Sequence, residues 1–196
     1  MKLSINVFCA GLAMLYMLQH NVVRGQGIPG FPPNCTCDRT PSHSPFRMAY
    51  SSYEIVPTTG YAKMCFVVNV VPCDKTATCC LANQTLYKLD MAVVPTCKPS
   101  LKEITIDGVR DTVYTWSTTV GVLTIREIGK TAANAQGTQI CLFLESPCNT
   151  AQTLCSTPGF CEFALFNNVP ARCCPISFAY PFNPPFTPES LSPPPP

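Results

Sequence analysis

Residues 140–175 read ICLFLESPCNTAQTLCSTPGFCEFALFNNVPARCCP, and this stretch decides the fold. Six cysteines fall within the 34 residues from Cys141 to Cys174. Apolar runs such as Ile140–Leu144 and Ala164–Phe166 lie between them. Short apolar runs between closely spaced cysteines are typical of a small oxidised domain that has strands in its core.

The first residues indicate export. A basic start at Lys2 precedes the mostly apolar run from Leu3 to Leu18, and the small residue Gly25 follows. This pattern predicts a secretory signal peptide over residues 1–25, removed after Gly25. A membrane anchor is the alternative, but the run is shorter than the about 20 apolar residues that a spanning helix needs. We expect no membrane contact once the signal is removed, because no later segment is long and apolar enough.

The remaining 171 residues (196 minus 25) suit one domain over residues 26–180, with a tail over residues 181–196. Removing Lys2 and Arg24 leaves 11 basic and 11 acidic residues, so the mature net charge is near zero. A nucleic-acid partner needs a basic surface, so we expect none.

Cysteine usage predicts a disulfide framework. Removing Cys9 with the signal leaves 13 of the 14 cysteines. In a secreted chain these form disulfides, and an odd number leaves one for an intermolecular bond or as a free thiol. Bridges between neighbours are geometrically difficult, so the members of each adjacent pair should bond different partners. Twelve cysteines allow 10,395 connectivities, and the sequence does not choose among them. The thirteen are Cys35, Cys37, Cys65, Cys73, Cys79, Cys80, Cys97, Cys141, Cys148, Cys155, Cys161, Cys173 and Cys174.

Periodicity predicts eight or nine short strands and almost no helix. Strands are expected over residues 47–54, 65–71, 86–94, 102–106, 109–116, 122–128, 138–144, 161–166 and 174–178. Asp107-Gly108 predicts a hairpin turn, because both positions need positive φ. The only helix-like stretch is residues 149–154, with Asn149 as its expected cap.

This pattern predicts an all-β fold, a disulfide-stapled antiparallel β-sandwich. Its core is expected to contain Phe66, Val68, Val70, Leu89, Met91, Val93, Leu123, Ile125, Leu142, Leu144, Phe163 and Leu165.

Modification signals lie at both ends and in one loop. Asn34-Cys35-Thr36 and Asn83-Gln84-Thr85 are N-glycosylation sequons, and Asn83 is the better candidate because a bridged Cys35 hinders the transferase. Nine of the 22 residues from Pro175 to Pro196 are proline, which predicts a polyproline II tail; plain disorder is the alternative. Hydroxylation and O-glycosylation are expected at Pro193, Pro194, Pro195 and Pro196.

Several motifs together resemble a pherophorin domain, from extracellular-matrix glycoproteins of volvocine green algae. The resemblance covers about Phe31 to Phe178. It rests on the motifs Cys35-x-Cys37, Ser44-Pro45-Phe46-Arg47, Cys65-Phe66-Val67-Val68, Cys79-Cys80, Leu86-Tyr87-Lys88-Leu89, Ile140-Cys141-Leu142, Leu154-Cys155, Ala164-Leu165-Phe166-Asn167-Asn168 and Cys173-Cys174-Pro175.

The resemblance implies a secreted, non-enzymatic structural component of the matrix or cell wall, whose partners are matrix glycans and glycoproteins. Typical members carry two such domains joined by a hydroxyproline-rich rod, so the tail is expected to be either the start of a truncated rod or the stub of a short member. The family also includes relatives of a pheromone, so a diffusible signal or glycan-binding module is the alternative.

Catalytic and metal chemistry find little support in the residues. His43 is the only histidine left after signal removal, and it lies in a loop-like segment. A Cys–His nucleophile needs a reduced thiol, and structural zinc sites use other spacings than those here. Asp107 and Asp111 could reach a calcium ion, but the turn already explains Asp107. We therefore expect no catalytic residues, no metal and no cofactor.

One pair of aromatic residues is a candidate glycan contact. Tyr114 and Trp116 alternate onto one face of a predicted strand. Exposed aromatic rings stack on sugars, whereas burial in the core is the alternative that the size of tryptophan favours.

Overall fold

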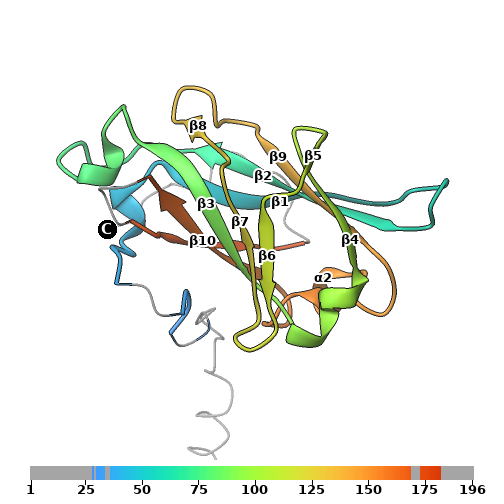
Figure 1. Ribbon diagram of the computed structural model, residues 1–196. Helices are drawn as coiled ribbons and strands as arrows, with labels where there is room; N and C mark the ends of the chain where they lie inside the picture. The colour runs from blue at the N-terminus through green and yellow to red at the C-terminus, as the bar shows by residue number, and fades with distance from the viewer. Residues whose placement is uncertain (1–27, 29, 34–35, 169–172, 182–196) are drawn as a thin grey trace, which may run out of the picture.

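The computed structural model describes residues 28, 30–33, 36–168 and 173–181, and these form a nearly all-β domain (Figure 1). The predicted signal peptide and nearly all of the proline tail lie outside them. The strands are β1 (Phe46–Ile55), β2 (Ala62–Val70), β3 (Thr85–Ala92), β4 (Leu101–Ile106), β5 (Val109–Asp111), β6 (Tyr114–Ser117), β7 (Val122–Ile125), β8 (Lys130–Thr131), β9 (Gln139–Leu144), β10 (Cys161–Asn167) and β11 (Ile176–Ala179). Short helical turns complete the described part: η1 (Pro41–His43), η2 (Thr78–Cys80), η3 (Pro95–Ser100) and α2 (Ala151–Leu154).

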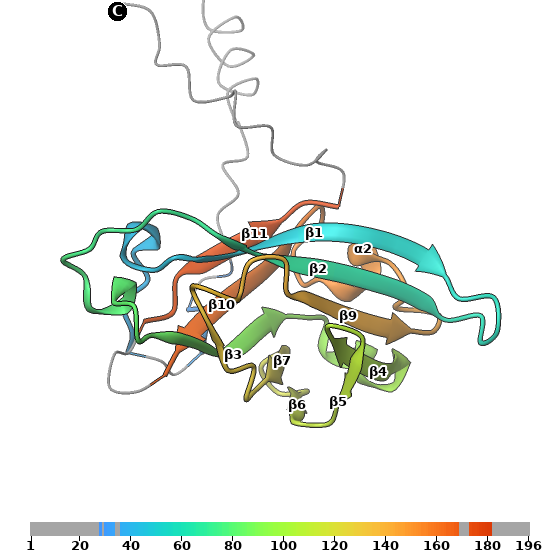
Figure 2. The ribbon, with the colours of Figure 1, turned by 90° about the horizontal axis from the view of Figure 1, so that it is seen from above.

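The strands form two antiparallel sheets. One has the order β1-β2-β9-β4-β5, and the other has the order β11-β10-β3-β7-β6, with β8 paired to the start of β3. Figures 1 and 2 show the second sheet lying against the first, with α2 and η3 at one end of the sandwich and η1 and η2 at the other. The predicted all-β antiparallel sandwich is confirmed.

The core lies between the two sheets. Alternate residues of β2 and β9 face β3, β7 and β10, as the period-two patterns predict. Phe66 of β2 and Phe163 of β10 meet edge to face, with their ring centroids 4.9 Å apart. Every predicted core residue is buried except Val70, which is partly buried and packs against the same cluster.

Strand β3 departs from simple alternation at its start. Period-two alternation through Leu89 and Met91 would place Tyr87 on the core face, but Leu86 is buried and Tyr87 is exposed. The pairing of β3 with β10 shifts register between Phe166, which pairs with Lys88, and Asn167, which pairs with Leu86. Tyr87 is therefore an extra, unpaired residue in β3 at this point. Such a bulge moves the side chains on one side of it to the opposite face.

The predicted strand over residues 109–116 is wrong, because it divides between the two sheets. Asp107 and Gly108 have φ of 51° and 79°, and they close the expected hairpin between β4 and β5. After β5, Asp111 Oδ1 accepts the Val113 N–H at 3.0 Å, an Asx turn that redirects the chain. The next strand, β6, therefore pairs with β7 in the other sheet.

The expected helix cap is also one residue off. The turn α2 begins after Thr150, whose hydroxyl accepts the Thr153 N–H at 3.3 Å, while Thr153 Oγ1 accepts the Thr150 N–H. This reciprocal capping box satisfies two backbone donors and stands in place of the expected cap at Asn149 with Gln152 three residues on.

A serine joins the two sheets at one corner. Ser177 Oγ of β11 accepts the Met48 N–H at 2.9 Å and donates to the Met48 carbonyl at 3.1 Å. The first half of the edge strand β1 is thereby covered, whereas its second half extends with β2 as a long hairpin beyond the neighbouring strands (Figure 2). Among the described residues, no helix has the length and apolar character to cross a membrane.

Candidate functional site

Three disulfides are linked in series at one end of the sandwich. We call them the cysteine ladder: Cys73–Cys80, Cys79–Cys173 and Cys174–Cys37. The members of each adjacent cysteine pair bond different partners, so each pair carries the connection from one bridge to the next. The ladder joins the segment after β2 to the end of β10 and then to the segment before η1.

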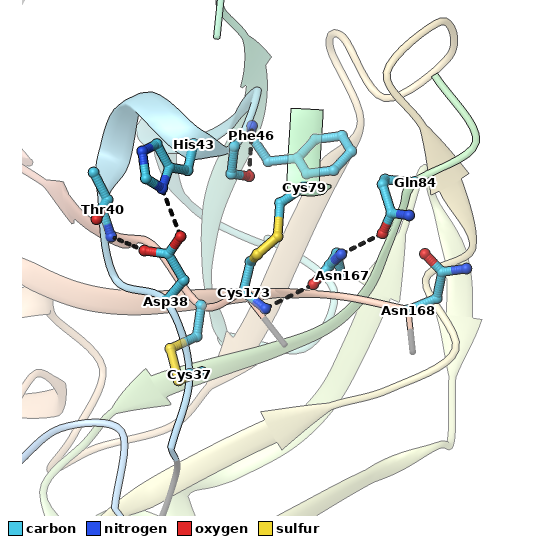
Figure 3. The surroundings of a disulfide bond; sticks show 12 residues. Cys37, Asp38, Thr40, His43, Phe46, Cys79, Gln84, Asn167, Asn168 and Cys173 are labelled. Carbon is cyan, nitrogen blue, oxygen red and sulfur yellow. Dashed lines mark hydrogen bonds and ion pairs between the residues drawn. A yellow bond between two sulfur atoms is a disulfide. The ribbon is translucent and has the colours of Figure 1, made fainter. Parts of the chain in front are cut away.

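Backbone contacts reinforce the ladder. Asp38 and Cys173 form an isolated parallel bridge, and the Cys174 N–H donates to the Asp38 carbonyl at 2.8 Å. The N-terminal segment is thus held beside the segment that leads into β11, the last strand. Figure 3 shows Asp38 between Cys37 and the turn that carries His43.

A polar network covers one side of the ladder. Oδ2 of Asp38 lies 2.6 Å from Nδ1 of His43, and its Oδ1 accepts the Thr40 N–H at 2.9 Å. The His43 hydrogen bond, followed by that of Thr40, holds the pKa of Asp38 below its ordinary value. About a third of each side chain is exposed. His43, the last residue of η1, therefore braces the loop through Asp38, and no cysteine thiol is available beside it in the oxidised ladder.

A buried amide forms the other side. Asn167, at the end of β10, accepts the Cys173 N–H at 2.9 Å and donates to Oε1 of Gln84 (Figure 3). Its neighbour Asn168 accepts the Thr85 N–H at 3.0 Å. The two asparagines hold β10 to the start of β3. Neither asparagine stands out as a functional residue in the sequence, although both belong to the Ala164–Asn168 motif of the resemblance.

The other three disulfides each fix one local junction. Cys65–Cys141 joins directly paired residues of β2 and β9, on the side of the sheet that faces away from the core. Cys97–Cys148 ties η3 to the loop before α2, and Cys155–Cys161 ties the end of α2 to β10. Twelve of the thirteen expected cysteines are bridged; the thirteenth, Cys35, lies outside the described residues.

The structure describes Asn83, the acceptor of the second sequon, but not Asn34, the acceptor of the first. Asn83 is exposed in the loop between η2 and β3, beside the buried Gln84. Thr85 of the same sequon begins β3. An exposed asparagine in a loop suits a surface glycan. Asn34 lies outside the described residues, as do Pro193 to Pro196.

The aromatic pair on β6 is divided between core and surface. Trp116 is 8% exposed and belongs to the core, whereas Tyr114 is half-buried against it. A buried indole ring offers no face for a sugar, so the burial alternative fits Trp116. Its Nε1–H has no hydrogen-bond partner among the described residues.

The acidic residues that raised the calcium alternative have other partners. Asp107 accepts the Gln139 N–H at 2.9 Å and pairs with Lys130 at 2.8 Å. Asp111 forms the Asx turn before β6. The part of the chain that the structure describes contains no group of three or more His, Cys, Asp or Glu side chains placed to hold a metal.

A charged cluster lies on the outer face of the second sheet. Asp90 is 4% exposed, and its carboxylate accepts from Lys88 Nζ at 3.0 Å and from Thr124 Oγ1 at 2.7 Å. Lys88 Nζ also lies 3.5 Å from the centre of the Phe166 ring. These contacts satisfy the buried carboxylate within the sheet, so the cluster fixes β3, β7 and β10 together.

Comparison with known proteins identifies a family and two relatives. A family model described as Pherophorin matches residues 31–175. Perphorin-2 of Volvox carteri is 30% identical over 170 residues, covering 72% of this chain and 34% of the relative. Sulfated surface glycoprotein 185 of Volvox carteri is 28% identical over 159 residues, covering 74% of this chain and 32% of the relative. No solved structure matches the chain.

The chain therefore spans about a third of the length of these curated relatives. The matched residues 31–175 contain every bridged cysteine, both sheets except the last strand, and the whole cysteine ladder. The match is thus to the folded domain itself, and the chain belongs to the pherophorin family.

Proposed function

We propose that this chain is a secreted structural glycoprotein of an extracellular matrix or cell wall, in which the domain binds matrix glycans or other glycoproteins. The observation that carries the proposal is the family match over residues 31–175, together with relatives whose names include a surface glycoprotein. The six disulfides support it, because such bonds persist in an oxidising extracellular setting.

The architecture suits a structural role rather than catalysis. The polar side chains around the ladder are engaged with backbone groups and with one another, as Asp38 and Asn167 are. Such networks rigidify a fold, whereas catalytic groups are directed at a substrate position. We therefore propose a non-enzymatic protein, in which β11 runs from the ladder to the α2 end of the sandwich before the sequence continues into the proline tail.

The odd cysteine extends the proposal to assembly. If Cys35 bonds a second molecule, oxidised protein migrates as a covalent dimer or larger species on a non-reducing gel. The Cys35→Ser variant should then migrate as a monomer. A monomer in both cases rejects the intermolecular bond and leaves matrix binding to be tested separately.

The deciding experiment follows the protein after secretion. A tagged full chain expressed in a volvocine alga should co-fractionate with the salt-extracted matrix, and the purified protein should bind isolated matrix polysaccharide. A reduced and alkylated sample is the control, because it keeps the composition but loses the disulfide-held shape. Protein that stays in the medium and acts on cells at low concentration would instead support the diffusible-signal alternative. Protein that neither enters the matrix nor binds its glycans contradicts the structural proposal.

A further inference from the structure

The most N-terminal described residue is held by a buried carboxylate. The backbone nitrogen of Ile28 donates to Oε2 of Glu162 at 2.7 Å. Glu162 lies on the outer face of β10 and is only 3% exposed. The Ile28 side chain packs against a second apolar cluster, which contains Phe31, Ala92, Val122, Ala164 and Cys174. Both the nitrogen and the side chain of Ile28 therefore have defined places on the sheet.

The position of Ile28 is set by the residues that come after it in the chain. The Phe31 N–H donates to the Ile28 carbonyl at 3.0 Å, and Gly30 has φ of +80°, as a tight turn requires. Phe31 is 5% exposed and enters the same apolar cluster. Further along, the Cys37–Cys174 bridge fixes the segment.

Glu162 lacks a full counter-charge among the described residues. No lysine or arginine nitrogen of the described part forms an ion pair with it. Arg39 acts on it only at longer range, and its guanidinium donates to the Pro32 carbonyl. Burial raises the pKa of Glu162 above its ordinary value, because a carboxylate loses its hydration there. A single amide N–H compensates a buried charge poorly.

The sequence before Ile28 is Gly25-Gln26-Gly27, with small residues three positions and one position before the Gly27–Ile28 bond. Signal peptidases cut after that pattern. We propose that the mature chain begins at Ile28, and that its α-ammonium forms a buried ion pair with Glu162. In the cleavage, water adds across the Gly27–Ile28 amide; Gly27 leaves as a carboxylate, and Ile28 keeps its nitrogen as an ammonium at neutral pH. The cut lies two residues after the bond that the sequence pattern first suggests.

The new terminus would complete the site. An ammonium at the Ile28 nitrogen brings a full positive charge and further donors to the place where one N–H now meets Glu162. Removal of the leader would then also stabilise the mature fold, because the ion pair exists only after cleavage.

The direct test is the N-terminus of the secreted protein. The full-length chain, with its own leader, is secreted from algal cells and analysed by Edman sequencing and by mass mapping of the N-terminal peptide. The expected first residue is Ile28. A start at Gln26, including its cyclised pyroglutamate form, or at any other residue overturns the proposal.

A second test measures the ion pair in oxidatively refolded chains that begin at Ile28 or at Gln26, each with Glu162 or with Glu162→Gln. Starting at Ile28 should raise the melting temperature by about 5 °C when Glu162 is present, and by much less with glutamine. Glu54→Gln, at an exposed glutamate, is the matched control and should keep the difference. Equal melting temperatures for the two wild-type chains contradict the ion pair, even if the Glu162→Gln chains do not fold.

Discussion

Cys79, in η2, is bonded to Cys173, which follows β10, across 94 residues of sequence. The bond is the middle member of the cysteine ladder, so its neighbours already shorten the loop that it closes. When Cys73–Cys80 and Cys174–Cys37 are intact, they already connect Cys79 to Cys173 through the chain between Cys37 and Cys73. That connecting chain is 36 residues long (73 minus 37). The stability that this bond contributes is set by that shorter loop.

Removing the Cys79–Cys173 bond should lower the free energy of unfolding more than removing a disulfide that closes a short loop. In the loop-entropy model, closing about 36 residues is worth about 1.5 kcal/mol more than closing the six-residue separation of Cys155–Cys161. We expect the double variant Cys79→Ser and Cys173→Ser to lose about 3–4 kcal/mol in the free energy of unfolding. Denaturant unfolding of both double variants measures the difference.

The comparison with Cys155→Ser and Cys161→Ser is the control for losing buried sulfur, because these cysteines are also buried. Equal losses in the two variants would mean that loop closure does not govern the contribution of the ladder. A larger loss in the short-loop variant would reject the model outright.

Asn167 should be among the most sensitive polar positions. Asn167→Ala leaves the Cys173 N–H and the Gln84 side chain without their partner in a buried setting, at a cost of about 2–3 kcal/mol. Asn69→Ala is the control, because Asn69 accepts only one exposed hydrogen bond, from Gln136, and should lose less than about 0.5 kcal/mol. Thermal unfolding of both variants checks this; similar losses would show that the amide clamp is not needed.

The parts of the fold that could be predicted are those set by local sequence. Alternation placed Leu89 and Met91 in the core, and the Asp107-Gly108 pair identified the hairpin turn between β4 and β5, because each depends only on neighbouring residues. The end of β5 at Asp111 was not predicted, because the same residues are compatible with one long strand and with an Asx turn. Which sheet a strand joins depends on contacts far away in sequence.

The candidate site was predictable only in outline. The adjacent pairs Cys79-Cys80 and Cys173-Cys174 imply separate partners by geometry alone. The choice of Cys37 and Cys73 as those partners follows from the folded path of the chain, which no spacing encodes. The role of Glu162 was likewise hidden, because its position in a strand suggests a solvated side chain and the segment at Ile28 covers it only in the folded domain.

Gly121 should not tolerate a side chain. Its φ is +65°, and a Cβ atom there would lie 2.6 Å from the Val93 carbonyl oxygen. Because that oxygen is part of the backbone, the chain just after β3 would have to move, and we expect Gly121→Ala to lower the free energy of unfolding by about 3 kcal/mol or more. Gly60→Ala is the matched control: φ is +73° with open space around it, so only the backbone term of about 1 kcal/mol applies. Equal melting temperatures for the two variants would contradict the clash.

The Asp38–His43 pair should make stability fall in acid. The pKa of Asp38 is held low by the His43 hydrogen bond, so its contribution is present above the unfolded-state pKa and is lost as pH falls through the lowered folded value. The difference in unfolding free energy between wild type and Asp38→Asn should be fully present above the ordinary aspartate pKa of about 3.9 and should shrink as the pH falls below it. The pair is partly exposed, so the difference stays below about 1 kcal/mol and shrinks in high salt.

Chemical denaturation at several pH values measures this difference. Glu103→Gln serves as the control, since no hydrogen bond or ion pair of the Glu103 side chain is found in the described part of the chain. A pH-independent difference for Asp38→Asn would mean that its carboxylate charge contributes nothing to the fold.

Asn83 should carry an N-glycan in the secreted protein. The Asn83 side chain is exposed, and its sequon ends at Thr85. The modification requires the Thr85 hydroxyl. The pairing of β3 and the contact with Asn168 use only the Thr85 backbone. Thr85→Val should therefore abolish the glycan while keeping the shape of the strand, and Thr85→Ser should keep it. Peptide mass mapping before and after enzymatic deglycosylation reads out all three chains. An unmodified Asn83 peptide in the wild type, or a glycan that persists in Thr85→Val, would show that the exposed sequon is not used.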